Sequence, residues 1–447
     1  MHLEVAFAQP ASANVSTSLS ALTCLTYLGL EGLLHFRQQG GYSGGAMVAG
    51  DLDLALCAPH LESLSLAYGQ ATCREPAQLP MLRSLQQETP TLRALHLRSC
   101  ACLSRLELGL HCEVGRTHID ALSSCKALEA LLIGQYVADP GPFSMEEFAG
   151  LSALQSLALR FTAHGSKYYM SPELSSLVHL TSLELSPTAS ASLCGSIEAT
   201  PRLKRLALDS THCSHLLRSA TLTSLTIRAH RGYGYTPEEV VPLGSLPALR
   251  QLHLSDCLEG DPGPYASRAS RFVESASLQS LQVLTVDLAY CSAASPLDTH
   301  QPRDSGDISG FLVFISEAVP GLEALKVTAM RRDVALDVRR MPWRHLALAC
   351  RGLTLGPEHA VSEAQQRAQP CTLRLPASLH LLFESTHPSA ASLLLGLGAE
   401  KKLLSSGDLY MNRELQEWKL GEPNAHDLAA QVAFGSMQTV YDNGFYL

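Results

Sequence analysis

Leucines recur along the chain in one short pattern. The stretches LTCLTYLGL (22–30), LSALQSLALR (151–160) and LPALRQLHLSDC (246–257) share the spacing LxxLxxLxL. The two leucines of LxL lie on the same face of a strand, and the leucine three residues earlier enters the same core from the preceding turn. The pattern therefore predicts a series of short strands that bury two leucines each and turn the residue between them to the opposite face.

This pattern continues through most of the chain. The spacing between the first positions of successive LxL pairs runs from 19 to 41 residues, and most spacings fall between 19 and 32. A lone repeat of this size loses more entropy on ordering than its few buried leucines recover, so the repeats must stack and share one core. The first leucines of the predicted LxL strands are Leu28, Leu64, Leu95, Leu131, Leu157, Leu183, Leu206, Leu225, Leu252, Leu284, Leu325, Leu346 and Leu373.

The repeats resemble the leucine-rich repeat family over about residues 19 to 376. The resemblance implies an α/β leucine-rich repeat solenoid, or horseshoe, with a parallel sheet on the concave face and helices and loops on the convex face. Asparagine, which often follows LxLxx in this family, is absent between residues 15 and 411. Cysteine takes this position or lies within two residues of it, which resembles the irregular, cysteine-containing intracellular branch; these cysteines are Cys100, Cys257, Cys291 and Cys350.

Sequence signals for the start of a helix occur between some of the predicted strands. Ser144 and Thr236 each begin a capping box, and Ser171 is followed by proline and glutamate. Residues 307–317 carry apolar side chains at helical spacing. We expect these helices to form the convex face.

The N-terminal residues alternate in the manner of a strand. Leu3, Val5 and Phe7 share one face, and Leu3 lies one repeat length before Leu28. The chain is therefore expected to begin inside a repeat without a polar cap, which suggests either missing upstream sequence or an edge that pairs with another chain.

The pattern predicts a change of structure near the C-terminus. We assign residues 1–376 to the solenoid and residues 377–447 to a C-terminal cap or tail. The runs TLRL (372–375) and LHLLF (379–383) alternate and are joined by Pro-Ala-Ser, which is typical of a hairpin.

The C-terminal segment itself is predicted to be an irregular α+β cap over the last leucine layer. A strand at 393–397, a helix at 427–434 and a partly buried Trp418 are expected in it. The alternative is a tail that becomes ordered only when it binds a partner.

Charge and composition limit the range of possible functions and partners. Thirty-three basic and 42 acidic side chains give a net charge of −9, which argues against nucleic acid or a membrane as the main partner but allows a local basic strip. Thirteen cysteines without a CxxC pair exclude a zinc ribbon. Without a secretory signal or a spanning apolar run, we expect a soluble cytoplasmic protein, with the cytoskeleton or a ciliary axoneme as the alternative.

Candidate binding residues come from two places. The longer inserts are expected to emerge along one rim and carry tyrosines, which suit binding surfaces; an equally simple interpretation is that each ring covers an end of the core. The concave face presents polar side chains of mixed sign, and a merely solvated face, including solvent-facing histidines, is the alternative there. The candidates are Tyr168, Tyr169, Tyr233 and Tyr235 on the rim and His96, Arg98, Arg160, Arg228 and His253 on the sheet.

No catalytic signature accompanies the repeats. The glycine-rich stretches lack the GK[ST] ending of a phosphate loop, and neither GxSxG nor HExxH occurs. We therefore predict no enzyme activity, no cofactor and no metal. The expected function is a scaffold that binds a protein partner, whose identity the sequence does not specify. The alternatives are the substrate-recognition part of an F-box-like ubiquitin ligase receptor that lacks its F-box, and a cytoskeletal or axonemal repeat protein.

Overall fold

The protein consists of two compact units, Met1–Asp209 and Ser210–Leu447, which are described separately. The structure is a computed structural model. It describes residues 2–6, 24–31, 60–67, 81–87, 101–114, 116–136, 143–161, 170–171, 174–186, 196–198, 200–208, 217–228, 245–255, 279–287, 312, 315–316, 318–336, 343–355, 378–386, 394–395, 399–405 and 414–420.

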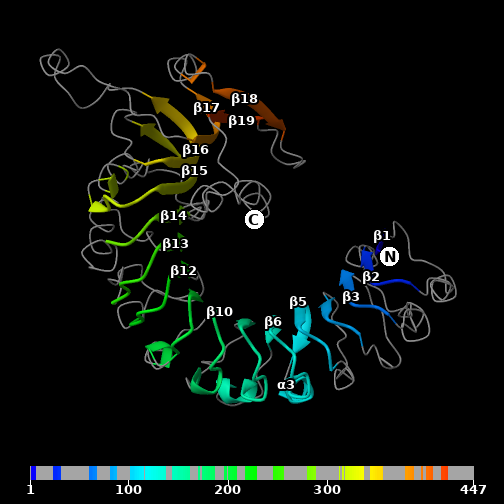
Figure 1. The fold of residues 1–447 in the computed structure, drawn as a ribbon. Coiled ribbons are helices and arrows are strands. Elements are labelled where there is room, and N and C mark those ends of the chain that lie inside the picture. The colour runs from blue at the N-terminus through cyan, green and yellow to red at the C-terminus, as the bar shows by residue number, and fades with distance from the viewer. Residues whose placement is uncertain are drawn as a thin grey trace, which may run out of the picture. The chain divides into compact units, whose positions relative to one another are not determined.

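The first unit is built on parallel strands that follow one another in chain order (Figure 1). Each neighbouring pair is in register through its leucines: Leu3 is opposite Leu28, and Leu157 is opposite Leu183. The strands are β1 (His2–Ala6), β2 (Tyr27–Glu31), β3 (Ser63–Ala67), β4 (Ser84–Gln87), β5 (Arg105–Val114), β6 (Ala130–Tyr136), β8 (Ser156–Phe161), β10 (Ser182–Ser186) and β11 (Arg205–Leu208).

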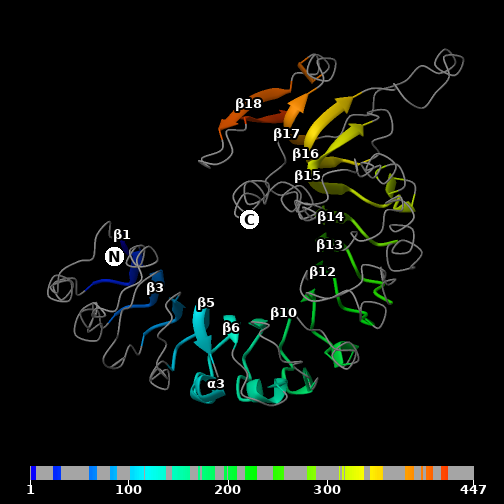
Figure 2. The same cartoon turned by 180° about the vertical axis from the view of Figure 1, so that it is seen from behind.

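The second unit repeats this arrangement and then changes strand direction (Figure 2). Strands β12 to β17 pair in parallel, β19 pairs antiparallel with β17, and β18 pairs antiparallel with β19. The strands are β12 (Ser224–Arg228), β13 (Gln251–Ser255), β14 (Val283–Asp287), β15 (Ala324–Leu336), β16 (His345–Leu355), β17 (Ser378–Thr386), β18 (Glu400–Ser405) and β19 (Glu414–Leu420).

Leucines form the core of both units, as the pattern predicts. The strand leucines Leu28 and Leu252 are 0% and 3% exposed, and Leu25 and Leu249, which precede them by three residues, are both 0% exposed. In the repeat of β16 this preceding position is taken by Trp343, which is also buried. A parallel, open array of strands on a repeated apolar core is the arrangement expected of a repeat solenoid.

One backbone contact recurs at the start of the strands. The carbonyl of Thr26 accepts hydrogen bonds from the N–H groups of both Glu62 and Ser63, at 2.9 and 3.0 Å. The carbonyl of Arg250 accepts the same pair of bonds from Gln282 and Val283, at 2.8 and 2.9 Å. Each repeat is thus anchored to the next just before the strand, independently of its side chains.

At two of the predicted helix starts, the described residues form a single 3₁₀ turn instead of an α-helix. The capping box at Ser144 is followed by one 3₁₀ turn, η2 (Met145–Phe148), and Ser171 is followed by η3 (Leu174–Ser176). A seven-residue α-helix, α3 (Arg116–Leu122), lies between β5 and β6, and the two-residue strands β7 (Phe143–Ser144) and β9 (Met170–Ser171) pair with each other. The predicted start at Thr236 lies outside the described residues.

Two predicted strand positions are wrong. The register passes from Leu64 to Leu85 and Leu106 before it reaches Leu131, so these two residues take the place assigned to Leu95. The repeat at Leu85 was missed because Gln87 stands where the pattern expects its last leucine.

Leu379, not Leu373, pairs with Leu346 and continues the array. The run from Leu379 is free of proline through Thr386, whereas Pro376 ends the earlier run after four residues. The hairpin prediction is also wrong, because β17 is paired on both edges, with β16 and with β19.

The rest of the C-terminal prediction is only partly described. Residues 394 and 395 are helical, so the predicted strand at 393–397 is wrong, and the next strand begins at Glu400. Trp418 lies in β19, but its side chain and the predicted helix at 427–434 lie outside the described part. The division at residue 376 stays a prediction.

Candidate functional site

The residue between the two leucines of each strand points away from the leucine core. We call these residues the inter-leucine row, since the strand pairing places them side by side. In the first unit the row is Glu4, Gly29, Ser65, Gln86, Glu107, Leu132, Ala158, Glu184 and Ala207. In the second unit it is Thr226, His253, Thr285, Lys326, Ala347 and His380.

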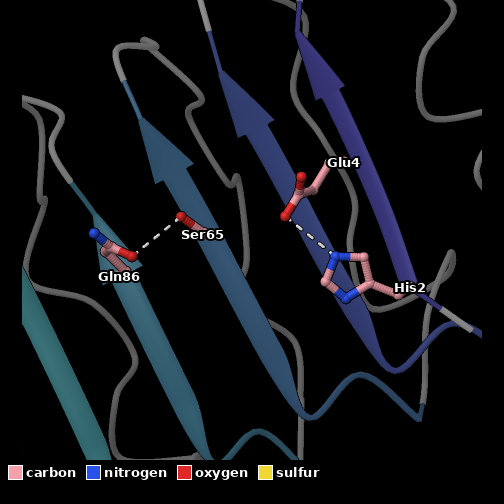
Figure 3. A network of polar contacts seen from close by, with 4 residues as sticks. All are labelled: His2, Glu4, Ser65 and Gln86. Atoms are coloured by element: carbon pink, nitrogen blue, oxygen red, sulfur yellow. Dashed lines mark hydrogen bonds and ion pairs between the residues drawn. The ribbon is translucent and has the colours of Figure 1, made fainter. Parts of the chain in front are cut away.

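The row of the first unit is acidic and open to solvent. Its ionisable members are all glutamates, and each member except Gly29 is exposed or half-buried. Glu107 accepts a hydrogen bond from Arg105 on its own strand at 3.4 Å. Ser65 donates a hydrogen bond to Gln86 on the next strand at 3.4 Å (Figure 3). Contacts of this length between solvated groups contribute little stability.

A small aromatic cluster lies at the N-terminal end of the same face. The imidazole of His2 stacks on the ring of Tyr27 at 3.8 Å between centroids. Its Nε2 contacts Glu4 Oε1 at 3.1 Å (Figure 3). Gly29 makes room for this cluster, because a Cβ there would lie 3.2 Å from both the Tyr27 hydroxyl and Glu4 Cγ. Burial and, after it, the charge of Glu4 raise the pKa of Tyr27.

The row of the second unit is basic and becomes buried along the array. Thr226 and His253 are half-buried, whereas Thr285, Lys326 and His380 are 8%, 2% and 6% exposed. Burial opposes the charge of Lys326 and lowers its pKa, and the carboxylate of Asp287 acts in the other direction. A nearly inaccessible lysine ammonium requires such a partner nearby.

A polar triad lies at the end of the row, on β17 and β19. Nε2 of His380 lies 2.8 Å from Glu417 Oε1, and Nζ of Lys419 lies 3.0 Å from the same oxygen. Burial lowers the pKa of His380 more than Glu417 raises it, so the neutral ring donates from Nε2. Burial opposes ionisation of Glu417, but its bonds to Lys419 and His380 prevail and its pKa is lowered.

His253 differs from the solvent-facing imidazole that the sequence suggests. Burial, followed by the positive charges of Arg228 and Lys326, lowers its pKa to about 4. The ring is therefore neutral at pH 7. Its two cationic neighbours come from β12 and β15, so the array places three basic side chains from separate repeats on one face.

The structure brings two of the predicted candidate residues together. Arg228 and His253 lie on neighbouring strands β12 and β13, where Arg228 is in register with Ser255. Arg160 belongs to β8 in the first unit, and only its backbone is described. The other candidates, His96, Arg98, Tyr168, Tyr169, Tyr233 and Tyr235, lie outside the described residues.

His380 and its partners were missed in the sequence. His380 fills the same position after Leu379 that His253 fills after Leu252, so the correct register identifies it at once. Glu417 and Lys419 carry no such signal, because they reach the face through an antiparallel strand outside the repeat.

The described part of the chain contains no group of three or more histidine, cysteine, aspartate or glutamate side chains that is suited to a metal ion. Cys350 is fully buried in β16. No helix among the described ranges is long and apolar enough to cross a membrane. Comparison with known protein families and with curated proteins finds no match for this chain.

Proposed function

We propose that the chain is a leucine-rich repeat protein of the irregular, cysteine-containing type that acts as an interaction scaffold. In this proposal the strands line the concave face of an α/β horseshoe, and a protein partner binds to that face and to the loop rim. The leucine core and the recurring shared carbonyl support the repeat assignment, because both return once per repeat in the two units.

The observation that carries the interaction role is the contrast between the two inter-leucine rows. Packing and strand pairing require leucine on one face but place no demand on the charge of the other. Even so, the ionisable members are all glutamates in the first unit and are lysine and histidines in the second. Rows that carry different ionisable side chains are suited to the selection of a protein partner.

A reducing compartment fits this function. The thirteen cysteines are scattered along the chain without a CxxC pair. Such dispersed cysteines are more often reduced core residues than a disulfide framework. We therefore propose the cytoplasm, with the cytoskeleton or an axoneme as the alternative location, and cell fractionation distinguishes them.

Proximity labelling in cells tests the scaffold role. The full chain is compared with two face variants, Glu107→Lys with Glu184→Lys in the first unit and Arg228→Glu in the second. Arg250→Glu is the matched control, because Arg250 is exposed and directly precedes β13 instead of lying within a strand. We expect one set of labelled proteins to disappear with a face variant and to remain with the control.

The labelled proteins also separate the candidate roles. Ligase subunits favour the ubiquitin ligase receptor, and tubulin-associated proteins favour the cytoskeletal role. A partner that the labelling identifies is then purified and titrated against the same variants by calorimetry. If every labelled protein is kept by both face variants, and none binds the purified chain, the scaffold proposal is wrong.

A further inference from the structure

A second row of side chains lies in the turns that precede the strands of the first unit. Its members stand four residues before the first leucine of each strand, and we call them the turn row. The shared carbonyl two residues further on holds each turn to the next, so neighbouring members lie about one strand spacing, roughly 4.8 Å, apart. The turn row is Cys24, His60, Met81, Cys102, Ala127, Ala153, His179 and Arg202.

Side chains of the turn row reach from one repeat to the next. Nη1 of Arg202 lies 2.8 Å from Nδ1 of His179, and this contact is exposed to solvent. The same backbone bonds hold the other turns of the row. Exposed side chains of neighbouring members are therefore close enough to share one ligand.

The first four members of the turn row are all potential ligands of a soft metal ion. Cys24, His60, Met81 and Cys102 belong to four successive repeats, and each is exposed. Met81 is 40% exposed, so packing of the leucine core does not explain a methionine at this position. Thiolate and thioether sulfurs select Cu(I), and imidazole also binds copper.

The spacing of two of these members fits one ion held between two sulfurs. A bond between a thiolate and a metal ion such as zinc is about 2.3 Å long, so two sulfurs on opposite sides of one ion are about 4.6 Å apart. This distance is close to the strand spacing of about 4.8 Å. Met81 and Cys102 are neighbouring members that both carry sulfur, and His60 adjoins Met81 on the other side.

The thioether distinguishes this set from an ordinary metal cluster. The residues that the structure describes contain no group of three or more histidine, cysteine, aspartate or glutamate side chains suited to a metal ion. Here methionine supplies one of the ligands, which favours a soft ion over zinc. Short sequence motifs do not reveal the set, because its ligands come from separate repeats of unequal length.

We propose that Met81 and Cys102 bind one Cu(I) ion through Sδ and Sγ, with the imidazole of His60 as the adjacent third ligand. The Cys102 thiol releases its proton to water as the bond between sulfur and copper forms. Copper stays Cu(I) throughout, so no electron is transferred. The inference does not depend on the scaffold function.

The test titrates the reduced full-length chain with Cu(I) under nitrogen, in competition with the chelator bathocuproine disulfonate. Cys102→Ser should weaken the tightest site by at least about 100-fold, which is the upper end of the cost of losing an outer-shell partner. Met81→Leu keeps the size of the side chain and should weaken binding about tenfold, because a thioether is the weaker ligand.

Cys24→Ser is the matched control for this titration. Cys24 is an exposed cysteine of the same row, but His60 separates it from Met81. We expect Cys24→Ser to change the affinity by less than about twofold, since it removes none of the proposed ligands. Circular dichroism establishes that each variant is folded before binding is measured.

X-ray absorption at the copper edge identifies the ligands directly. The chain loaded with one equivalent of Cu(I) should show two sulfur neighbours and the scattering pattern of an imidazole. Met81→Leu should remove one sulfur, and His60→Gln should remove the imidazole pattern.

Three outcomes overturn the inference. The first is unchanged affinity in Cys102→Ser, which places the ion on other cysteines. The second is a Met81→Leu variant that keeps both its affinity and its sulfur signal, which indicates a site without the thioether. The third is displacement of copper by an equal concentration of Zn²⁺, which identifies an ordinary zinc site instead of a soft one.

Discussion

The two strand arrays share one core pattern and differ on the opposite face. In both units, leucines at fixed positions are buried and hold neighbouring strands in register. The ionisable members of the inter-leucine row are solvated glutamates in the first unit, whereas in the second they are a lysine and two histidines, and that row becomes buried from β14 onwards. The leucine repeat therefore specifies strand pairing but not the surface, which is free to differ in charge and burial.

The difference in burial changes what a polar contact contributes. The pair Arg105 and Glu107 is solvated on both sides, and such pairs contribute between zero and about 1 kcal/mol. The pair His380 and Glu417 is buried, so loss of one partner leaves the other polar group buried without this hydrogen bond and without water to replace it. Substitutions on the second face should therefore have larger effects than those on the first.

The largest effect is expected in the core that both units share. Leu206→Asp in β11 and Leu252→Asp in β13 each bury an unpaired charge, which costs several kcal/mol, on the order of 5. Neighbouring repeats should unfold with the altered one, because each depends on the next for its core. Circular dichroism melts measure the total loss.

Tryptophan fluorescence separates the two units in this experiment. Both tryptophans of the chain, Trp343 and Trp418, belong to the second unit. Leu252→Asp should therefore lower the midpoint of the fluorescence transition more than Leu206→Asp does. A melt that neither substitution changes would contradict the shared leucine core.

Acid should destabilise the second unit through its histidines. The folded pKa of His253 is about 4, below the ordinary 6.5, so between these values the unfolded chain binds the proton more tightly. The contribution of His253 to the free energy of unfolding is therefore fully present above pH 6.5. It is lost as the pH drops toward 4, by at most about 3 kcal/mol. The lowered pKa of His380 acts in the same direction.

Urea titrations at pH 7 and pH 4.5, followed by tryptophan fluorescence, measure this loss. His253→Gln cannot take up the proton, so it should lose less stability than the natural chain between the two pH values. His2→Gln is the matched control, because His2 is exposed on the first unit. Equal losses in the two variants would exclude His253 as a source of the acid sensitivity.

A smaller effect is expected from a buried hydroxyl. Thr328 is 1% exposed, and its Oγ1 has no hydrogen-bond partner among the residues that the structure describes. Thr328→Val replaces the hydroxyl with a methyl group and should stabilise the second unit by about 1 kcal/mol. Thr226→Val makes the same change at a half-buried position and should have almost no effect. Destabilisation by Thr328→Val in urea unfolding would show that the hydroxyl has a partner in solution.

The smallest effect is expected on the solvated face. Glu107→Gln removes the ion pair with Arg105 and should change the free energy of unfolding by less than about 0.5 kcal/mol. Chemical denaturation followed by circular dichroism is sensitive enough to set this limit. A loss comparable to that of a core substitution would remove the distinction between the two faces.

The sequence predicted the core more completely than the face. Leucine spacing located Leu28, Leu183 and Leu325 in the register, because burial of a fixed face leaves a periodic trace. It failed at Leu85, whose repeat ends in glutamine, and it chose Leu373 over Leu379 because both fit a local alternation.

The candidate site was predictable only where it follows the repeat. Arg228 and His253 are found by their positions beside the leucines, but the burial of Lys326 depends on what packs over the face, which the repeat does not encode. Glu417 reaches His380 by a reversal of chain direction. Such long-range pairs leave no periodic signal in a single sequence.

The shared carbonyl before each strand has a consequence for how this chain tolerates changes in length. Only the stretch from that carbonyl to the end of the strand has to keep its spacing, because the two bonds fix where the next strand starts. The distance in sequence between successive strand leucines accordingly ranges from 19 residues, between Leu206 and Leu225, to 41, between Leu284 and Leu325. Insertions elsewhere in a repeat lengthen the connection without shifting any strand, so the protein can acquire new surface loops while its core stays constant.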